Sequence, residues 1–411
     1  MTDTIAIFSI VGAIIAIGFA ANLFFKKTGF PSSLFLILIG IILGPVSGIF
    51  RPADVDPITP FLTTLTLMMI LFEGGLNMDI YKFISQSFRA AVLAIVYVSS
   101  AAIFVTGFAH FVLGFQWLEA LMLGPMTAGT SSVVIIPLVS KMNINKDIEV
   151  TLSLESTITD VFNIVLVLAI LQAYISGLVN LQQTVITVLG KFAIGAALGT
   201  TIGIAWIRIL YLERKEEYTY MLTLGVLIGC YAVSETLGGS GPLSALLFGL
   251  MLGNDREVFK MLKIKLDLAY LNEIKSFVKR TQGELAFLIR AFFFVFLGLI
   301  YGVGGGGFPI WLGIIIAMVI ISVNLVLRYG AATIATWKSS MFQYRRFVTF
   351  MCGIGLANAT LSILLYRELS PTMANAYLYP AIVTNIIMLT NIITSIAPLI
   401  VKPQQDRQWS W

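Results

Sequence analysis

The segment Leu154-Glu155-Ser156-Thr157-Ile158-Thr159-Asp160 decides the fold, because it places two carboxylates and three hydroxyls inside an apolar run from Ile148 to Ile175. A helix over that run is long enough to cross a bilayer. Ionisable side chains at this depth cost roughly 2.5–3.5 kcal/mol or more each, so they usually face a cavity or a partner and mark an ion or proton path. The segment therefore indicates a functional site inside a membrane-spanning helix.

The same segment presents two chemically different faces on a helix. Ser156 and Asp160 are four residues apart and share one face, with Asn163 just beyond. Glu155 and Thr159 share another face, rotated by about 100°. We expect the Asp160 face to bind an ion and the Glu155 face to brace the helix against a neighbour.

The composition excludes a soluble fold. Of the 411 residues, 58% are hydrophobic and 11% are charged, and the mean hydropathy is +0.93, whereas soluble domains carry about 25% charged residues. The net charge of +5 is small and spread over short loops, which argues against a nucleic-acid partner. Cys230 and Cys352 lie in apolar segments and fit no disulfide framework or metal motif. No nucleophile–base pair appears either, so an enzyme is not expected, and His110 is assigned to the membrane interface.

Apolar segments of about 18 or more residues, separated by polar or Gly/Pro breaks, predict an all-α polytopic membrane protein with about 13 transmembrane helices. The expected spans are 4–25, 32–49, 58–77, 88–113, 117–140, 148–176, 182–211, 218–237, 241–254, 284–303, 308–336, 343–366 and 372–401. The first span lacks the basic start of a signal peptide and is too long for its core, so we expect it to be retained.

The basic residues predict the orientation of these spans. Odd-numbered connections hold nineteen Lys and Arg residues, and even-numbered connections hold Arg51 and Arg367 alone. The positive-inside rule therefore places the N-terminus outside and the C-terminus in the cytoplasm of a cell-membrane protein. The longest connection, 254–283, has the pattern of an amphipathic helix on the cytoplasmic surface, acting as a solvated linker or as a regulatory element.

Two predicted spans are poor continuous helices. The fifth contains small and polar residues between Gly124 and Pro137, and the twelfth contains a similar stretch from Gly353 to Thr360. Such backbone is tolerated at membrane depth only beside protein or a water-filled cavity. The two spans are seven apart, and interrupted spans at matching positions of two halves indicate a transporter site near the midplane. Small-residue helix packing explains either span alone, but the matched pair beside Asp160 favours transport.

These residues resemble the monovalent cation:proton antiporter family, particularly its NhaP-like, NHE-like branch. The resemblance rests on Thr130-Ser131-Ser132 in span 5, on the segment from Glu155 to Asp160 in span 6, and on the interrupted span 12. It implies an NhaA-like fold with inverted repeats and two broken crossing helices. It also implies that Asp160 binds a cation and a proton alternately, and that Ser156 and Thr130 help to ligate the cation.

The resemblance implies further roles. Glu155 matches a buried glutamate that pairs with an arginine of span 11, here Arg328. Glu73, at the end of span 3, resembles an acidic residue at the ion site or its entrance, and it fits a helix rim equally well. Arg290 competes for the pairing with Glu155, or extends its charge to the membrane interface. Thr159 stands where relatives carry asparagine, and is included among the expected site residues.

The chain departs from the family at three places, which leaves the ion selectivity open. One is Thr159; the second is the sequence Thr130-Ser131-Ser132, where relatives have Thr-Asp-Pro. The third is span 12, which lacks the second arginine of relatives. The residues that carry the exchange and the brace are unaffected by these departures.

The expected function is exchange of an alkali cation (Na⁺ or Li⁺) for H⁺ without net charge movement, since a single acid binds one ion or one proton. K⁺/H⁺ exchange and a Na⁺-coupled solute symporter remain alternatives, and a cation channel fits poorly because a filter needs rings of carbonyls or acids. The expected transport domain is 88–176 with 308–401, and the expected dimerisation domain is 1–87, 182–283 and 284–307. Residues 402–411 form a cytoplasmic tail. The expected partners are the two ions, lipid and a second copy of the chain, without a cofactor.

Overall fold

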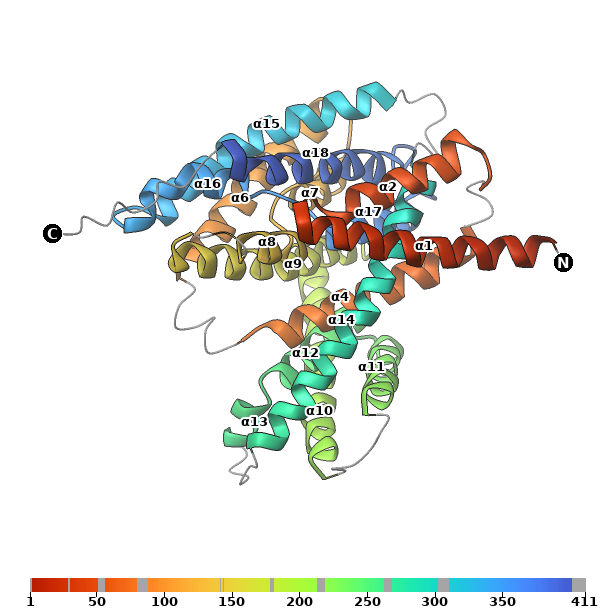
Figure 1. The fold of residues 1–411 in the computed structure, drawn as a ribbon, viewed down its shortest axis with the longest axis vertical. Helices are drawn as coiled ribbons and strands as arrows, with labels where there is room; N and C mark the ends of the chain where they lie inside the picture. The colour runs from red at the N-terminus through yellow and green to blue at the C-terminus, as the bar shows by residue number, and fades with distance from the viewer. Residues whose placement is uncertain are drawn as a thin grey trace. The chain divides into compact units, whose positions relative to one another are not determined.

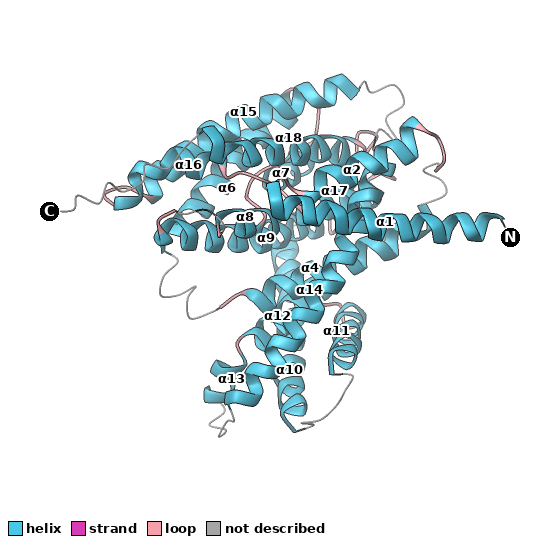
Figure 2. Cartoon of the chain, in the orientation of Figure 1, coloured by secondary structure: helices cyan, strands magenta, loops and turns pink. Residues whose placement is uncertain are grey.

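The chain folds into helices throughout the part that the structure describes. The computed structural model describes residues 2–28, 30–50, 56–79, 88–140, 142, 144–177, 181–212, 219–261, 268–301 and 310–400. No β-strand occurs within these ranges (Figure 2). The predicted all-α class is confirmed.

The elements follow the predicted spans (Figure 1). Their bounds are α1 (Thr2–Thr28), α2 (Ser32–Ile41), a π-helical turn (Ile42–Val46), a 3₁₀ turn (Asp56–Ile58), α4 (Thr59–Asn77), α6 (Phe88–Phe111), α7 (Trp117–Met126), α8 (Ser132–Val139), α9 (Lys146–Ile175), α10 (Leu181–Leu212), α11 (Thr219–Thr236), α12 (Gly241–Gly253), α13 (Asp255–Met261), α14 (Leu268–Leu299), α15 (Ile310–Ala335), a 3₁₀ turn (Ser340–Tyr344), α16 (Arg345–Phe350), α17 (Leu356–Leu369) and α18 (Leu378–Ile400).

A helix or an interrupted helix occupies each of the thirteen predicted spans. Within the described ranges, seven helices are long and apolar enough to cross a membrane by length and composition: α4, α6, α9, α10, α14, α15 and α18. Three shorter apolar helices lie in 12–25, 32–46 and 241–253. The remaining predicted spans correspond to α11 and to the two interrupted helices, α7 with α8 and α16 with α17.

The connection between spans 9 and 10 differs from its prediction. Residues 268–283 do not form a separate surface helix, because α14 runs without interruption from Leu268 to Leu299. The weakest helix former in that stretch is Gly283, which costs about 1 kcal/mol and does not stop the helix. The short helix α13 precedes it, and residues 262–267 and the predicted tail lie outside the described residues.

The chain divides into two compact units. Unit 1 contains residues 1–60, 86–167 and 291–411, and unit 2 contains residues 61–85 and 168–290. This division groups 1–60 and 291–307 with the spans of the expected transport domain. The assignment of a transport and a dimerisation domain stays a prediction.

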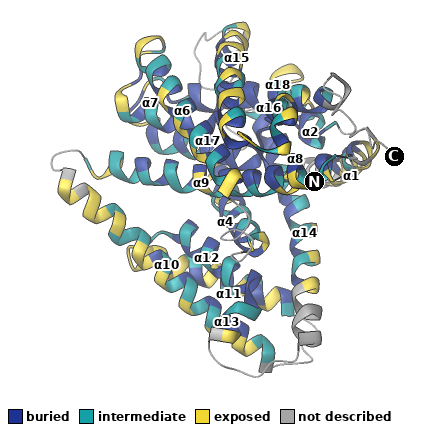
Figure 3. Ribbon diagram, turned by 90° about the vertical axis from the view of Figure 1, so that its left-hand side faces the viewer, coloured by how far each residue is buried: buried dark blue, intermediate teal, exposed yellow. Residues whose placement is uncertain are grey.

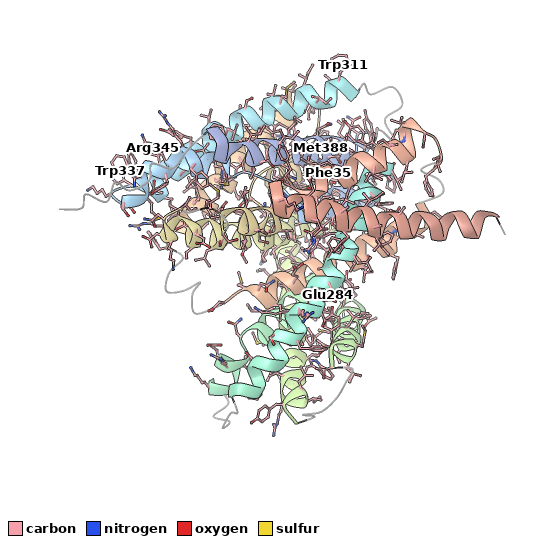
Figure 4. All side chains as sticks on the ribbon, viewed as in Figure 1. Phe35, Glu284, Trp311, Trp337, Arg345 and Met388 are labelled. Carbon is pink, nitrogen blue, oxygen red and sulfur yellow. The ribbon has the colours of Figure 1, made fainter. Side chains whose placement is uncertain are left out.

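Unit 1 is built around α15, which packs against α6, α16 and α18, while α6 packs against α7 and α17 against α18. One buried apolar cluster joins α6, α8, α9, α15, α16 and α18, and its members include Tyr97, Ile135, Leu152, Phe347 and Met351. At the turn between α15 and α16, the guanidinium of Arg345 lies 4.1 Å from the centre of the Phe342 ring. Figure 4 labels Arg345 and the nearby Trp337, which is 61% exposed.

Unit 2 is built around α12, which packs against α10 and α11. Close approach of α10 requires glycine at Gly199, because a Cβ there would overlap the backbone of Ser244 in α12. Only 11% of the apolar window of α10 is buried, and Figure 3 shows this helix mostly in the colours of intermediate and exposed residues. An apolar helix with this pattern is typical of a lipid-facing span.

Candidate ion-binding site

Two helix interruptions meet in unit 1. Segment 127–131 separates α7 from α8, and segment 351–355 separates α16 from α17, as predicted for spans 5 and 12. The Ser131 backbone N–H donates to the Gly353 carbonyl over 2.8 Å. A Cβ on Gly355 would overlap the Ser131 side chain. Glycine at position 355 therefore allows the two unwound segments to touch.

Asp160 lies where α8 begins. Its Oδ2 accepts hydrogen bonds from the Ser132 backbone N–H at 2.9 Å and from the Ser132 hydroxyl at 2.7 Å. Ser132 is the first residue of α8, so the carboxylate sits at the positive end of that helix dipole. Asp160 is half-buried. The structure thus combines a partly accessible carboxylate with two hydrogen-bond donors from one residue, Ser132.

Thr130 and Thr159 join the first interruption to α9. The Thr130 backbone N–H donates to Thr159 Oγ1 at 3.1 Å, and Thr159 Oγ1 lies 3.0 Å from the Thr130 carbonyl. The Thr130 hydroxyl donates to Glu155 Oε2 at 2.8 Å. In this structure the Thr130 hydroxyl is therefore directed to the Glu155 face of α9.

Glu155 and Arg328 form a fully buried ion pair. Arg328 Nη1 donates to Glu155 Oε1 at 3.0 Å and Nη2 donates to Oε2 at 3.1 Å, and both side chains are 0% exposed. Arg328 also donates to the carbonyls of Val348 and Met351 at 3.1 and 2.8 Å. Its charge therefore also compensates the negative end of α16. Together with Thr130, this pair connects the two interruptions.

Polar side chains of α18 satisfy the second interruption. Thr394 Oγ1 donates to the Phe350 carbonyl and accepts from the Cys352 N–H, each at 3.2 Å. Thr390 Oγ1 accepts from the Ile354 N–H at 3.3 Å, and the Asn391 amide donates to the Ile354 carbonyl at 3.2 Å. Neutral side chains of α18 therefore satisfy four backbone groups of this interruption.

The other predicted residues lie apart from these contacts. Ser156 shares the helix face of Asp160 and is 0% exposed, but its hydroxyl donates to the Ser153 carbonyl at 3.0 Å on the same helix. Glu73 belongs to unit 2, where Arg290 Nη1 contacts both of its carboxylate oxygens at 3.2 and 3.3 Å. The expected competition of Arg290 for Glu155 is therefore corrected, because its partner is Glu73, while its place at the membrane interface stays a prediction.

Sequence reasoning missed Ser132 and the α18 side chains. Ser132 belongs to the motif of span 5, but its contact with Asp160 could not be inferred from the sequence, because the two residues are far apart in the chain. The α18 residues carried a usable signal, since Thr390, Asn391 and Thr394 recur at helical spacing within an apolar span. Buried polar residues with that spacing indicate a neighbour that needs hydrogen bonds.

The fold and the site together define a class, a multi-pass membrane protein with two interrupted helices that meet beside an intramembrane carboxylate, as in secondary transporters. The family model described as sodium/hydrogen exchanger, transmembrane, matches residues 10–403. The chain belongs to this family.

Curated relatives include cation/proton antiporters. The chain is 29% identical over 265 residues to the K(+)/H(+) antiporter NhaP2 of Shewanella sp. (strain ANA-3), covering 61% of this chain and 45% of the relative. It is 25% identical over 288 residues to the probable Na(+)/H(+) antiporter 2 of Methanocaldococcus jannaschii, covering 66% of this chain and 64% of the relative. The chain thus spans about half the length of the NhaP2 relative.

A solved structure supports the fold over the whole chain. The sodium proton antiporter MjNhaP1 from Methanocaldococcus jannaschii aligns with a TM-score of 0.75, 21% identity, and coverage of 98% of this chain and 97% of that chain. The predicted antiporter fold is confirmed at this level.

Proposed function

We propose that this protein is a secondary antiporter that exchanges an alkali cation for H⁺, with Asp160 binding either ion in turn. The observation that carries the proposal is the position of Asp160 at the start of α8, beside the meeting point of two unwound segments. A half-buried carboxylate can be neutralised there by a proton or by a hard cation with oxygen ligands. The site can change its exposure from one side of the membrane to the other at low free-energy cost only when Asp160 is neutralised, and that condition enforces exchange.

The ion pairs of Glu155 and Glu73 support an electroneutral cycle. Glu155 pairs with Arg328 in unit 1, and Glu73 pairs with Arg290 in unit 2. Each of these carboxylates already has a compensating charge. One proton or one monovalent cation on Asp160 then moves the same charge in each direction. Ser156, Thr130 and Thr159 remain the proposed further residues of the cation site, and Ser132 is added as the hydrogen-bonding partner of Asp160.

The identity of the cation is proposed as Na⁺ or Li⁺, with K⁺ as the alternative. The relatives divide between these possibilities, since NhaP2 is named a K(+)/H(+) antiporter and the Methanocaldococcus jannaschii protein a probable Na(+)/H(+) antiporter. A Na⁺-coupled solute symporter has less support, because the polar residues of the two interruptions are mostly small hydroxyls, which offer few groups to bind an organic solute. We further propose alternating access in the cell membrane, an outside N-terminus and a homodimer.

Proteoliposomes test the proposal. Adding Na⁺ or K⁺ outside acid-loaded vesicles should alkalinise the lumen without a change in voltage. Asp160→Asn should reduce this exchange to the level of empty vesicles while the protein stays folded. The control is Asp147→Asn, an exposed acid in the first turn of the same helix. Normal exchange by Asp160→Asn would remove the central assignment, and a voltage-driven current without proton movement would identify a channel.

A further inference from the structure

Two buried asparagines hold the first interruption from opposite helices. Asn163 of α9 donates from Nδ2 to the Ala128 carbonyl at 2.6 Å. Asn324 of α15 donates from Nδ2 to the Thr127 carbonyl at 2.8 Å. The two side chains are 1% and 4% exposed. They therefore anchor adjacent peptide groups of the unwound segment that leads to Ser132.

The orientation of both amides is fixed by these contacts. A backbone carbonyl only accepts hydrogen bonds, so each amide must turn its NH₂ group toward it and its oxygen away. Neither Asn163 Oδ1 nor Asn324 Oδ1 has a hydrogen-bond partner among the described residues. Buried oxygens in this state are rare in folded proteins and call for a donor or a cation.

Asn163 and Asn324 lie on the two helices that carry Asp160 and Arg328, α9 and α15. Asn163 follows Asp160 by three residues on α9, so the two side chains are neighbours on one helix surface. Gly129 belongs to the unwound segment and has φ +94°, and a Cβ there would fall 2.6 Å from Asn163 Nδ2. The unwound segment is therefore shaped to accept this amide closely, and a larger residue at position 129 would displace it.

We propose that the amide oxygens of Asn163 and Asn324 are further ligands of the transported alkali cation and set which cation the site prefers. The inference rests on the proposed function of Asp160. Neutral amide oxygens suit alkali cations because these hard ions take oxygen ligands, and they add no charge to the cycle. The number and spacing of such ligands distinguish cations by size.

The test compares Asn163→Ala and Asn324→Ala with the unchanged full chain in proteoliposomes. The KM values for Li⁺, Na⁺, K⁺ and Rb⁺ are measured, together with the rise in melting temperature that each cation produces in detergent. We expect the KM of the preferred cation to rise about tenfold for each variant, with a smaller change for the least preferred cation. The cation-dependent rise in melting temperature should shrink in parallel, since it reports binding without turnover.

A matched control removes a buried amide elsewhere. Gln282 of unit 2 is 1% exposed and also has an unpartnered amide atom, Nε2, so Gln282→Ala should alter stability without changing the order of KM values. If either alanine variant does not fold, Asn163→Cys and Asn324→Cys retain a weak donor and replace the oxygen with sulfur, which suits alkali cations poorly, and the same KM changes are expected.

Two results separate this inference from the proposed function. If the unchanged protein exchanges cations for protons but the variants keep its order of KM values and its cation-dependent melting shift, the oxygens bind water and the inference is overturned. If the unchanged protein shows no exchange, but cations raise its melting temperature and the asparagine variants lose that rise, the proposed function fails and the binding site stands.

Discussion

Asp160 and Ser132 form the contact on which the proposed exchange depends. Both bonds from Ser132 reach the same oxygen, Oδ2, at 2.9 and 2.7 Å. Hydrogen bonds to a charged group contribute about 1.5–3 kcal/mol each. Both donors come from one residue, so Ser132 holds the Asp160 carboxylate in place at the start of α8.

Ser132→Ala should therefore weaken cation binding. The lost hydroxyl removes one of the two groups that hold Asp160 at the start of α8, so the cation KM should rise about tenfold. The measurement is cation-driven proton movement in vesicles across a pH series, with Ser140→Ala at the far end of α8 as the control. A KM equal to that of the unchanged protein at every pH would show that this hydroxyl does not act on Asp160.

At the scale of the elements, the ion pair of Glu155 and Arg328 connects separate helices. Glu155 comes from α9, Arg328 from α15, and the guanidinium extends to the end of α16. Isolated charges at this burial are unfavourable, but here every charged atom has a partner of opposite charge or a backbone dipole. The pair is therefore expected to position the two interruptions rather than to carry protons.

Removing one partner of this pair should destabilise the protein. Glu155→Leu or Arg328→Leu leaves an uncompensated buried charge and should cost about 3–5 kcal/mol of stability. The double variant removes both charges, so its loss should be clearly smaller than the sum of the single losses. Thermal melting of the four proteins in detergent measures this coupling. Additive losses would show that the two side chains do not act as a pair.

At the scale of the whole molecule, the sequence predicted the spans and both interruptions. Hydropathy predicts membrane spans well because the bilayer core offers no hydrogen-bond partners, so the backbone of a span must form its hydrogen bonds within its own helix. The stretches beginning at Gly124 and Gly353 were recognisable for the same reason, since they lack the residues of a continuous apolar helix. The length of α14 was not predicted, because an amphipathic pattern does not reveal whether a helix continues into the next span.

The candidate site was predictable only in part. Helical spacing on α9 separates Glu155 from Asp160, but it does not reveal which distant side chains each one meets. The contact with Ser132, the pairing of Arg290 with Glu73 and the amide of Asn324 depend on contacts between segments far apart in the chain. Spacing within a single helix carries no information about such contacts.

The most direct test of the account is the pH dependence of the cation KM. If a proton and an alkali cation occupy Asp160 in turn, acidification should raise the apparent KM about tenfold per pH unit once the proton dominates, with an unchanged maximal rate. A KM that stays constant while the maximal rate falls with acidification would show that both ions bind together, and would contradict the exchange proposed for this site.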